Sequence, residues 1–227
     1  MCGRFALPIP FNKVMDHFLV RSELAVPPRY NIAPTQETIV IRQKSLTTME
    51  ITPMRWGLIP GWAKSAEIGA KLINARSETL AGKPSFRTAY KTRRCLIPAS
   101  GFFEWQQQGN RKQPYYIGLK GGKLFAMAGL WESWRDPAEK IVLSFTIITT
   151  EANSFVTRIH ERMPVIIDRE QYGLWLNPTT DTTILSQILK PWSSMMMTSW
   201  PVSTMVNNPK NDAPGCLVKI GSEGLPT

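Results

Sequence analysis

The residue with the most distinctive chemistry in this chain is the cysteine at position 2. Because its side chain is small, we expect Met1 to be removed, which leaves Cys2 with a free amine beside its thiol. Such a pair reacts with an aldehyde in two steps: the amine forms an imine, and the thiol then closes a thiazolidine ring. The α-amine has a reference pKa of about 7.7 to 8.0, so it is partly neutral near pH 7 and needs no cofactor. A Met-Cys start alone is more often an incidental residue at a frayed terminus.

Two titratable side chains are candidates for moving protons in that reaction. Glu104 lies in Gly-Phe-Phe-Glu-Trp at 101–105, where apolar neighbours disfavour the charged form of a carboxylate. His160 follows a predicted helix, and imidazole titrates in the range that imine formation requires. Each has a structural alternative, because a buried Glu more often pairs with an arginine and a lone His more often packs.

Polar and aromatic residues between positions 56 and 76 suit contact with unpaired DNA. Asn74 could hold an amine or a sugar hydroxyl, unless it caps a turn, and Arg76 could hold a phosphate. Trp56 and Trp62 flank a turn, and exposed rings near arginines stack unpaired bases. We expect Trp56 to fill the core instead, because it lies in the strand-like half of this segment.

The elements that must position these residues are predicted to be mostly strands. Runs of β-branched and aromatic residues predict strands at 50–58, 94–105, 115–119, 123–131, 141–149 and 164–167. Helices are predicted at 11–20, 77–90, 151–159, 169–176 and 181–189. Lys-Gly-Gly-Lys at 120–123 is typical of a hairpin turn, and the Pro-rich connectors at 27–34 and 207–214 predict surface loops.

These patterns predict an α+β fold with a central barrel-like, mostly antiparallel β-sheet flanked by helices. We see no linker that would divide the chain. We therefore expect a single domain over residues 1–227, with a tail after about residue 220.

Composition narrows the class of protein further. The 227 residues are 43% hydrophobic, enough for one sizeable core, and no apolar run reaches the length of a membrane span. The first residues lack a secretion signal, so a cytoplasmic, nucleoid-associated protein is expected. Three widely spaced cysteines and two histidines predict neither a disulfide framework nor a metal site. A monomer is the default expectation.

Charge is unevenly distributed along the chain. The formal net charge is +10, and residues 83–123 hold nine basic residues with Glu104 as the one acidic residue. Such a segment is either a solvated basic face or a phosphate-binding face, and the sequence favours neither.

Seven short motifs follow one another along the chain. They are Met-Cys-Gly-Arg-Phe at 1–5, Arg-Tyr-Asn-Ile-Ala-Pro-Thr at 29–35, Met-Arg-Trp-Gly-Leu-Ile-Pro-Gly-Trp at 54–62, Ile-Asn-Ala-Arg-Ser-Glu-Thr at 73–79, Cys-Leu-Ile-Pro-Ala-Ser-Gly-Phe-Phe-Glu-Trp at 95–105, Ile-His-Glu-Arg-Met-Pro at 159–164, and Pro-Val-Ser-Thr-Met-Val-Asn at 201–207 with Asn-Asp at 211–212. Together they resemble the SOS response-associated peptidase (SRAP) family, whose members crosslink to abasic sites in single-stranded DNA.

The resemblance implies a role for each matching residue. Cys2 would be the crosslinking nucleophile, Asn74 would position its amine and the sugar, and Glu104 and His160 would transfer protons. The residues implied to line the DNA channel are Arg4, Asn31, Pro34, Trp62, Arg76 and Arg162. No metal or cofactor is implied, and the implied partner is single-stranded DNA that contains an abasic site. Ala63 stands where some relatives carry a second aromatic residue, so base stacking beside Trp62 is expected to be weaker or differently placed.

Three other functions stay open at this stage. Glutamine amidotransferases with an N-terminal cysteine also begin Met-Cys-Gly, but the chain lacks the layered α/β pattern they need. A peptidase activity, such as self-cleavage after Met1, would use the same thiol. A non-covalent binder of single-stranded DNA would not need Cys2 at all.

Overall fold

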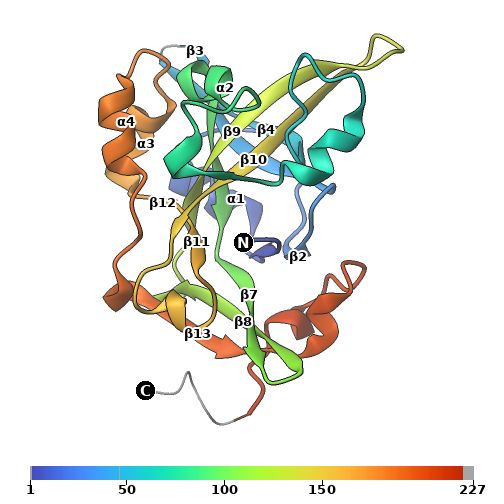
Figure 1. Cartoon of the computed structure of the whole chain (residues 1–227), viewed down its shortest axis with the longest axis vertical. Coiled ribbons are helices and arrows are strands. Elements are labelled where there is room, and N and C mark those ends of the chain that lie inside the picture. Colours follow the sequence, from blue (N-terminus) through green and yellow to red (C-terminus); the bar gives the residue numbers. More distant parts are fainter. Residues whose placement is uncertain (1, 46, 222–227) are drawn as a thin grey trace.

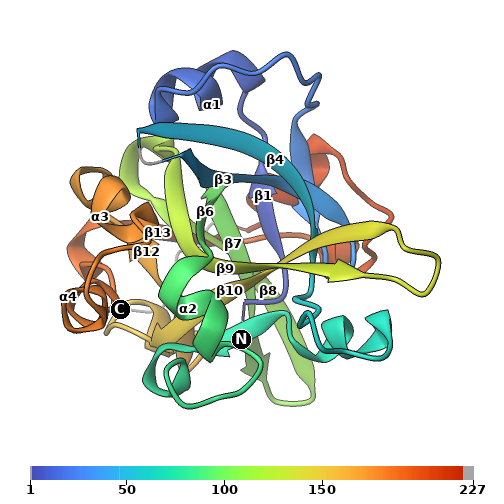
Figure 2. The same ribbon diagram turned by 90° about the horizontal axis from the view of Figure 1, so that it is seen from above.

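Five strands close into a barrel at the centre of the molecule. The structure is a computed structural model that describes residues 2–45 and 47–221. The ring runs β10-β4-β3-β6-β9 and back to β10, with β10 and β4 parallel and the other neighbours antiparallel. Its members are β3 (Glu37–Ser45), β4 (Thr48–Trp56), β6 (Arg94–Ala99), β9 (Phe125–Arg135) and β10 (Ile141–Glu151). Figure 2 shows these strands crossing one another around the barrel.

A second, antiparallel sheet lies against one end of the barrel. Its order is β13-β8-β7-β1-β2, and the strands are β1 (Phe5–Leu7), β2 (Arg29–Ile32), β7 (Gly101–Gln108), β8 (Arg111–Leu119) and β13 (Met197–Pro201). In Figure 1, β7, β8 and β13 lie below the barrel strands. The chain passes from β6 to β7 through Ser100, so the two sheets are joined directly.

Each face of the second sheet has its own core. Phe102 points into the large apolar cluster shared with the barrel, whereas Phe103 packs with Ala6 and Val202 in a smaller cluster on the other face. This follows from strand geometry, because successive side chains point to opposite faces. Trp56 lies fully buried in the large cluster, and its ring stacks on Phe145, as the sequence predicted.

Helices and short strands cover the outside of the barrel. The helices are α1 (Phe11–Phe18), α2 (Arg87–Thr92), α3 (Tyr172–Leu176) and α4 (Thr182–Ile188). The short strands are β5 (Asn74–Arg76), β11 (Arg162–Pro164) and β12 (Ile166–Ile167), and the 3-10 turns are η1 (Ala66–Lys71), η2 (Ser77–Thr79), η3 (Lys120–Gly122), η4 (Val156–Arg158), η5 (Arg169–Gln171), η6 (Ser194–Met196), η7 (Thr204–Asn207) and η8 (Pro214–Leu217). The α+β fold with a barrel-like, mostly antiparallel sheet is therefore confirmed.

Several local predictions were wrong in an instructive way. The single strand predicted at 94–105 is two strands in two sheets, because Ser100 donates its backbone N–H to Ala6 and turns the chain. The glycine turn at 120–123 is present, with Gly121 at φ 77° and Gly122 at φ 63°, but it is not a hairpin. It joins β8 to β9, which pair with different partners.

Other segments differ from prediction because long-range pairing overrides local pattern. Five described strands lie outside the predicted runs: β1, β2, β3, β5 and β13. The connector at 27–34 was predicted to be a surface loop, yet it contains β2 with Asn31 and Ile32 fully buried. The helix predicted at 151–159 is reduced to the turn η4, and the one at 77–90 to η2 and the first part of α2.

Two further expectations concern the C-terminal tail and membrane-spanning segments. Most of the tail expected after residue 220 lies outside them. Within residues 2–45 and 47–221, no helix combines the length and the apolar character needed to cross a membrane.

Candidate active site

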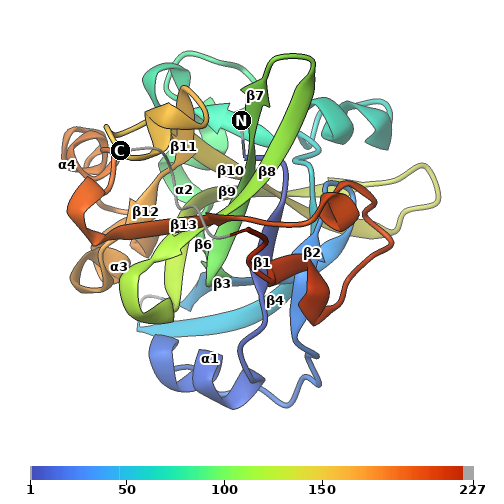
Figure 3. The same ribbon diagram turned by 90° about the horizontal axis from the view of Figure 1, so that it is seen from below.

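Cys2 is fully buried where the N-terminal segment meets the sheet. The segment is held because the Arg4 carbonyl accepts the backbone N–H of Phe103 at 2.9 Å, and the Cys2 Sγ lies 3.9 Å from the same oxygen. Figures 1 and 3 show the start of the chain beside β7 and β10. Burial raises the pKa of the Cys2 thiol, and the charge of Glu104 raises it further, so the two side chains are within electrostatic reach.

Glu104 enters this site from the middle of β7. It lies two residues after Phe102, so its side chain shares the face that looks toward the barrel. Only 3% of its surface is exposed, and burial raises the pKa of its carboxyl from 4.5 to about 7. A carboxyl group with this pKa can accept or donate a proton near neutral pH.

Asn74 holds the other side of Cys2. Its Nδ2 donates to the Cys2 carbonyl at 2.8 Å, and its Oδ1 is buried with no hydrogen-bond partner among the described residues. β5 places Asn74 by pairing in parallel with β10, where Ile147 faces Asn74. The alternative of a simple turn cap therefore does not apply to Asn74, because its amide reaches a residue 72 positions away.

His160 lies in the turn between η4 and β11. Its Nδ1 accepts the backbone N–H of Arg162 at 3.0 Å. Burial lowers the pKa of the imidazole, so the neutral ring is favoured at pH 7. The turn is tied to the strand of Glu104, because the Gln106 side chain donates to the Arg158 carbonyl at 2.9 Å.

The last residues of β10 bring these elements together. β4 and β9 both separate from β10 before its end, and β5 and β11 take their places on its two edges. Gly57 permits the loop that leads to β5, since its φ is 122° and a Cβ there would lie 2.6 Å from the Gly69 carbonyl oxygen. Four elements far apart in sequence thus carry Cys2, Asn74, Glu104 and His160 to one end of the barrel.

Three of the residues predicted to contact DNA are accessible. Arg76 is exposed, Pro34 is half-buried, and Trp62 is 62% exposed. Trp62 lines an open pocket of about 480 Å³ together with Ala63, Lys64, Ser65, Glu67, Ile68 and Lys71. The Trp134 indole anchors this loop by donating to the Ala63 carbonyl at 2.7 Å.

The other three residues of that set make intramolecular contacts. The Arg4 Nη1 donates to the Asn31 Oδ1 at 2.9 Å and to the Val206 carbonyl at 2.8 Å. Asn31 is fully buried, and its Nδ2 donates to the carbonyls of Val206, Asn208 and Asn211. Arg162 is 8% exposed and pairs with Glu78. Contact of these side chains with DNA stays a prediction.

Replacement of Asn31 by alanine is expected to destabilise the protein. Its amide satisfies three carbonyls of the C-terminal segment, so Asn31→Ala should lower the free energy of unfolding by about 3 kcal/mol. Urea denaturation measures this effect. Asn208→Ala is the matched control, because the Asn208 side chain is exposed and, among the described residues, accepts one hydrogen bond, from the Lys210 N–H. An equal loss in both variants would contradict the prediction.

The basic segment at 83–123 does not form one continuous face. Arg94 is buried and donates to backbone carbonyls that include Tyr90 and Trp175, and Arg93 pairs with Glu132. In Figure 1, α2 and β8, which carry others of the nine, lie at opposite ends of the molecule. No group of three or more His, Cys, Asp or Glu within the described part of the chain is arranged to hold a metal ion.

The fold and this site define a member of a known family. A family model described as SOS response associated peptidase (SRAP) matches residues 1–209, and the chain belongs to this family. It is 43% identical over 219 residues to the abasic site processing protein YoqW of Bacillus subtilis, covering 94% of this chain and 97% of that one. It is 33% identical to the abasic site processing protein HMCES of Xenopus tropicalis, over 85% of this chain and 66% of the relative.

Solved structures agree with the architecture. A crystal structure of a protein from Bacteroides thetaiotaomicron superposes with a TM-score of 0.89 at 29% identity, covering 96% of this chain and all of that one. A Bordetella bronchiseptica protein gives a TM-score of 0.77 at 25% identity, over 89% of this chain. The names of the relatives YoqW and HMCES place the chain in a family of abasic site processing proteins.

Two residues with a place in the site were not singled out from the sequence. Glu78 holds Arg162, and Gln106 ties β7 to the turn of His160. Glu78 stands within the motif at 73–79, four residues after Asn74, so its position was a usable signal. Gln106 carried none, because it belongs to a polar run at the end of a strand.

Proposed function

We propose that this protein captures abasic sites in single-stranded DNA as a covalent thiazolidine adduct on Cys2. The observation that carries the proposal is the hydrogen bond of the Asn74 Nδ2 to the carbonyl of the buried Cys2 at 2.8 Å, with the buried Glu104 carboxyl near enough to raise the pKa of the Cys2 thiol. The names of the curated relatives support abasic-site processing as the general task.

The chemistry balances without any external oxidant or cofactor. Hydrolysis of the Met1–Cys2 bond, which we treat as maturation by the protein itself, consumes one water, releases methionine and leaves Cys2 with a free amine. The amine nitrogen attacks the aldehyde carbon of the ring-opened sugar, and one water leaves as the imine forms. The thiol then adds across the C=N bond, with sulfur bonding to carbon and a proton passing to nitrogen.

The neighbouring residues suit these steps. Glu104, with a carboxyl pKa of about 7, would take a proton from the attacking amine and return one to the departing water. The buried Asn74 Oδ1 is an acceptor suited to the amine of Cys2. His160 would transfer a proton to the sugar oxygen that departs when the abasic sugar opens. Each group is held by its own element of the fold, so its position is set before the lesion arrives.

Docking of the strand would rely on charge and stacking. The net charge of +10 favours a polyanion, the exposed Arg76 suits a phosphate, and the exposed Trp62 ring suits an unpaired base. Arg4, Asn31, Pro34 and Arg162 are proposed to line the same channel. We expect the protein to act as a monomer in the cytoplasm, at the nucleoid.

The decisive experiment is adduct formation. Protein verified by mass to begin at Cys2 is incubated with a single-stranded oligonucleotide that carries one abasic site, then denatured by heat and separated by electrophoresis. We expect a shifted, heat-resistant band that is absent with an undamaged oligonucleotide. A processed protein that binds DNA in a salt-sensitive manner but gives no band would be a non-covalent binder instead.

A further inference from the structure

Glu78 and Arg162 form a two-point ion pair at the edge of the site. The Arg162 Nη1 donates to Glu78 Oε1 at 2.8 Å, and Nη2 donates to Oε2 at 3.0 Å. Two parallel hydrogen bonds fix the plane of a guanidinium as well as its position. The pairing lowers the pKa of the Glu78 carboxyl, so it is ionised at neutral pH.

The same guanidinium is fastened to the barrel. Arg162 Nη2 donates to the Thr149 carbonyl at 2.7 Å, and the side chain of Arg162 is 10% exposed, against 45% for Glu78. Arg162 is therefore held between η2 on one side and β10 on the other. Its backbone has little freedom to move relative to either element.

The backbone of Arg162 in turn fixes the proton on His160. The Arg162 N–H points at His160 Nδ1 at 3.0 Å, so Nδ1 must accept and cannot carry a proton in the neutral ring. Which ring nitrogen is protonated is set by the hydrogen bond that the other one makes. The proton of neutral His160 therefore resides on Nε2.

We propose that Glu78 is a positioning residue for the crosslinking reaction, acting through Arg162 to keep His160 in its Nε2–H form. In this form the ring presents a hydrogen-bond donor at Nε2, which suits the sugar oxygen that is released when the abasic sugar opens. The inference rests on the proposed function, because His160 meets a sugar oxygen only if the protein captures abasic sites.

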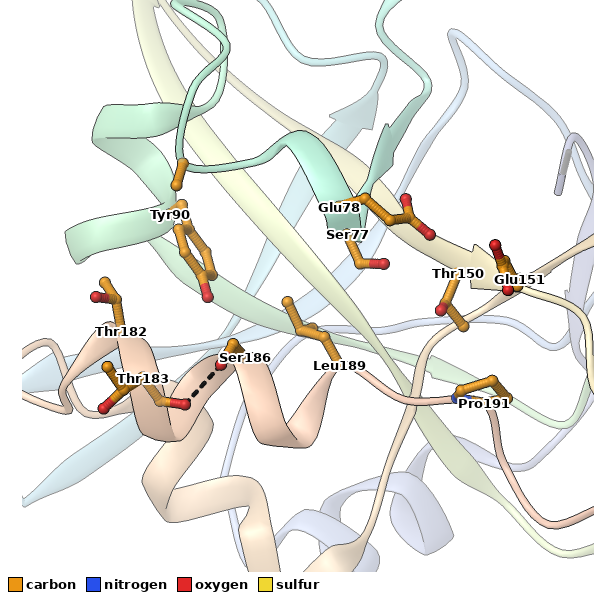
Figure 4. A pocket seen from close by; sticks show the side chains of 11 residues that line it. Ser77, Glu78, Tyr90, Thr150, Glu151, Thr182, Thr183, Ser186, Leu189 and Pro191 are labelled. Atoms are coloured by element: carbon orange, nitrogen blue, oxygen red, sulfur yellow. Dashed lines mark hydrogen bonds between the residues drawn. The ribbon is translucent and has the colours of Figure 1, made fainter.

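The surroundings of Glu78 provide a matched control. Glu78 and Glu151 both line an open pocket of about 660 Å³ between η2, the end of β10 and α4, which Figure 4 shows from close by. Glu151 is an exposed carboxylate and has no ion pair among the described residues. Glu151 faces Arg162 through the backbone pairing of β10 with β11, and among the described residues its side chain makes no hydrogen bond to the Arg162 guanidinium. Glu151→Gln therefore removes the same charge from the same pocket while the Glu78–Arg162 ion pair stays intact.

The tautomer is measured directly by long-range ¹H–¹⁵N NMR of the histidine rings. The chain has only His17 and His160, and a His17→Gln sample assigns the two. We expect the Nε2–H form for His160 in the wild type and in Glu151→Gln, and a mixture of both tautomers in Glu78→Gln. A wild-type His160 in the Nδ1–H form would overturn the proposal even if no Glu78 variant could be purified.

Crosslinking rates complete the test. Glu78→Gln should form the abasic-site adduct about tenfold more slowly than Glu151→Gln, because the donor is misplaced, and Glu78→Asp should recover part of the rate. The positioning role is refuted if Glu78→Gln keeps His160 in the Nε2–H form, or if it crosslinks as fast as Glu151→Gln. Failure of the wild type to form any adduct would instead refute the proposed function, so the two failures are distinguishable.

Discussion

Cys2→Ala should form no heat-stable adduct with an abasic oligonucleotide under conditions in which the wild type is fully crosslinked. Alanine keeps the α-amine, so the imine still forms, but without a thiol the imine cannot close to a thiazolidine and is lost to hydrolysis. Addition of borohydride during the reaction should therefore recover a stable adduct from Cys2→Ala, because reduction makes the carbon–nitrogen bond permanent. The Cys2→Ala reactions with and without borohydride thus separate the role of the amine from that of the thiol.

The matched control for this variant is Cys216→Ala. Cys216 is likewise fully buried, and its Sγ lies 3.3 Å from the Asn211 carbonyl, in the segment that packs on Arg4 and Asn31. Cys216→Ala should crosslink as the wild type does. A heat-stable adduct from Cys2→Ala without reductant would show that the thiazolidine chemistry does not occur here.

Glu104→Gln should slow crosslinking by roughly 10²-fold or more, the usual contribution of a positioned general acid–base group. Glutamine keeps the shape of the side chain but cannot exchange a proton near pH 7, which the carboxyl can do with its pKa of about 7. Affinity for an undamaged single strand should stay within about twofold, because the strand docks on other residues. Single-turnover rates and binding curves measure the two effects.

Glu132→Gln tests whether any buried carboxylate would have the same effect. Glu132 is 7% exposed and pairs with Arg93 at 2.6 Å, on β9. Its replacement should reduce stability and leave the crosslinking rate unchanged. Equal rates for Glu104→Gln and the wild type would remove Glu104 from the mechanism.

The same carboxyl predicts a pH dependence of stability. The pKa of Glu104 in the folded protein is about 7, above the ordinary 4.5, so the folded state holds an extra proton between these values. The free energy of unfolding therefore falls as pH rises from about 4.5 to 7, by about 3 kcal/mol at most. Glu104→Gln should lack this component. Urea unfolding of the wild type and of Glu104→Gln at pH 5 and at pH 8 gives the difference between their free energies of unfolding at each pH. A pH-independent difference would contradict the raised pKa.

Local features of this protein were accessible from the sequence. The helix predicted at 181–189 is α4, and Asp181 caps it by accepting the Thr183 N–H at 2.7 Å. The strands predicted at 115–119 and 141–149 lie within β8 and β10. These elements depend on side-chain periodicity and on contacts between residues a few positions apart, which a sequence displays directly.

The candidate site was predictable in its residue types and not in its arrangement. An N-terminal cysteine has its own chemistry in any fold, so Cys2 could be identified without coordinates, and apolar neighbours correctly predicted a raised pKa for Glu104. Nothing in the motif at 73–79 showed that the Asn74 amide reaches the Cys2 carbonyl. That contact requires β5 to pair with the end of β10, a pairing that no local pattern encodes.

The sequence by itself thus determined the reactive group, the family resemblance and most central strands. Only the tertiary structure decided that the chain changes sheets at Ser100, that Asn31 is buried under the C-terminal segment, and that Glu78 reaches His160 through Arg162. The physical reason is the same in each case. Periodicity reports which face of an element is buried, but the partner of a buried hydrogen-bonding group is chosen by residues that meet only when the barrel closes.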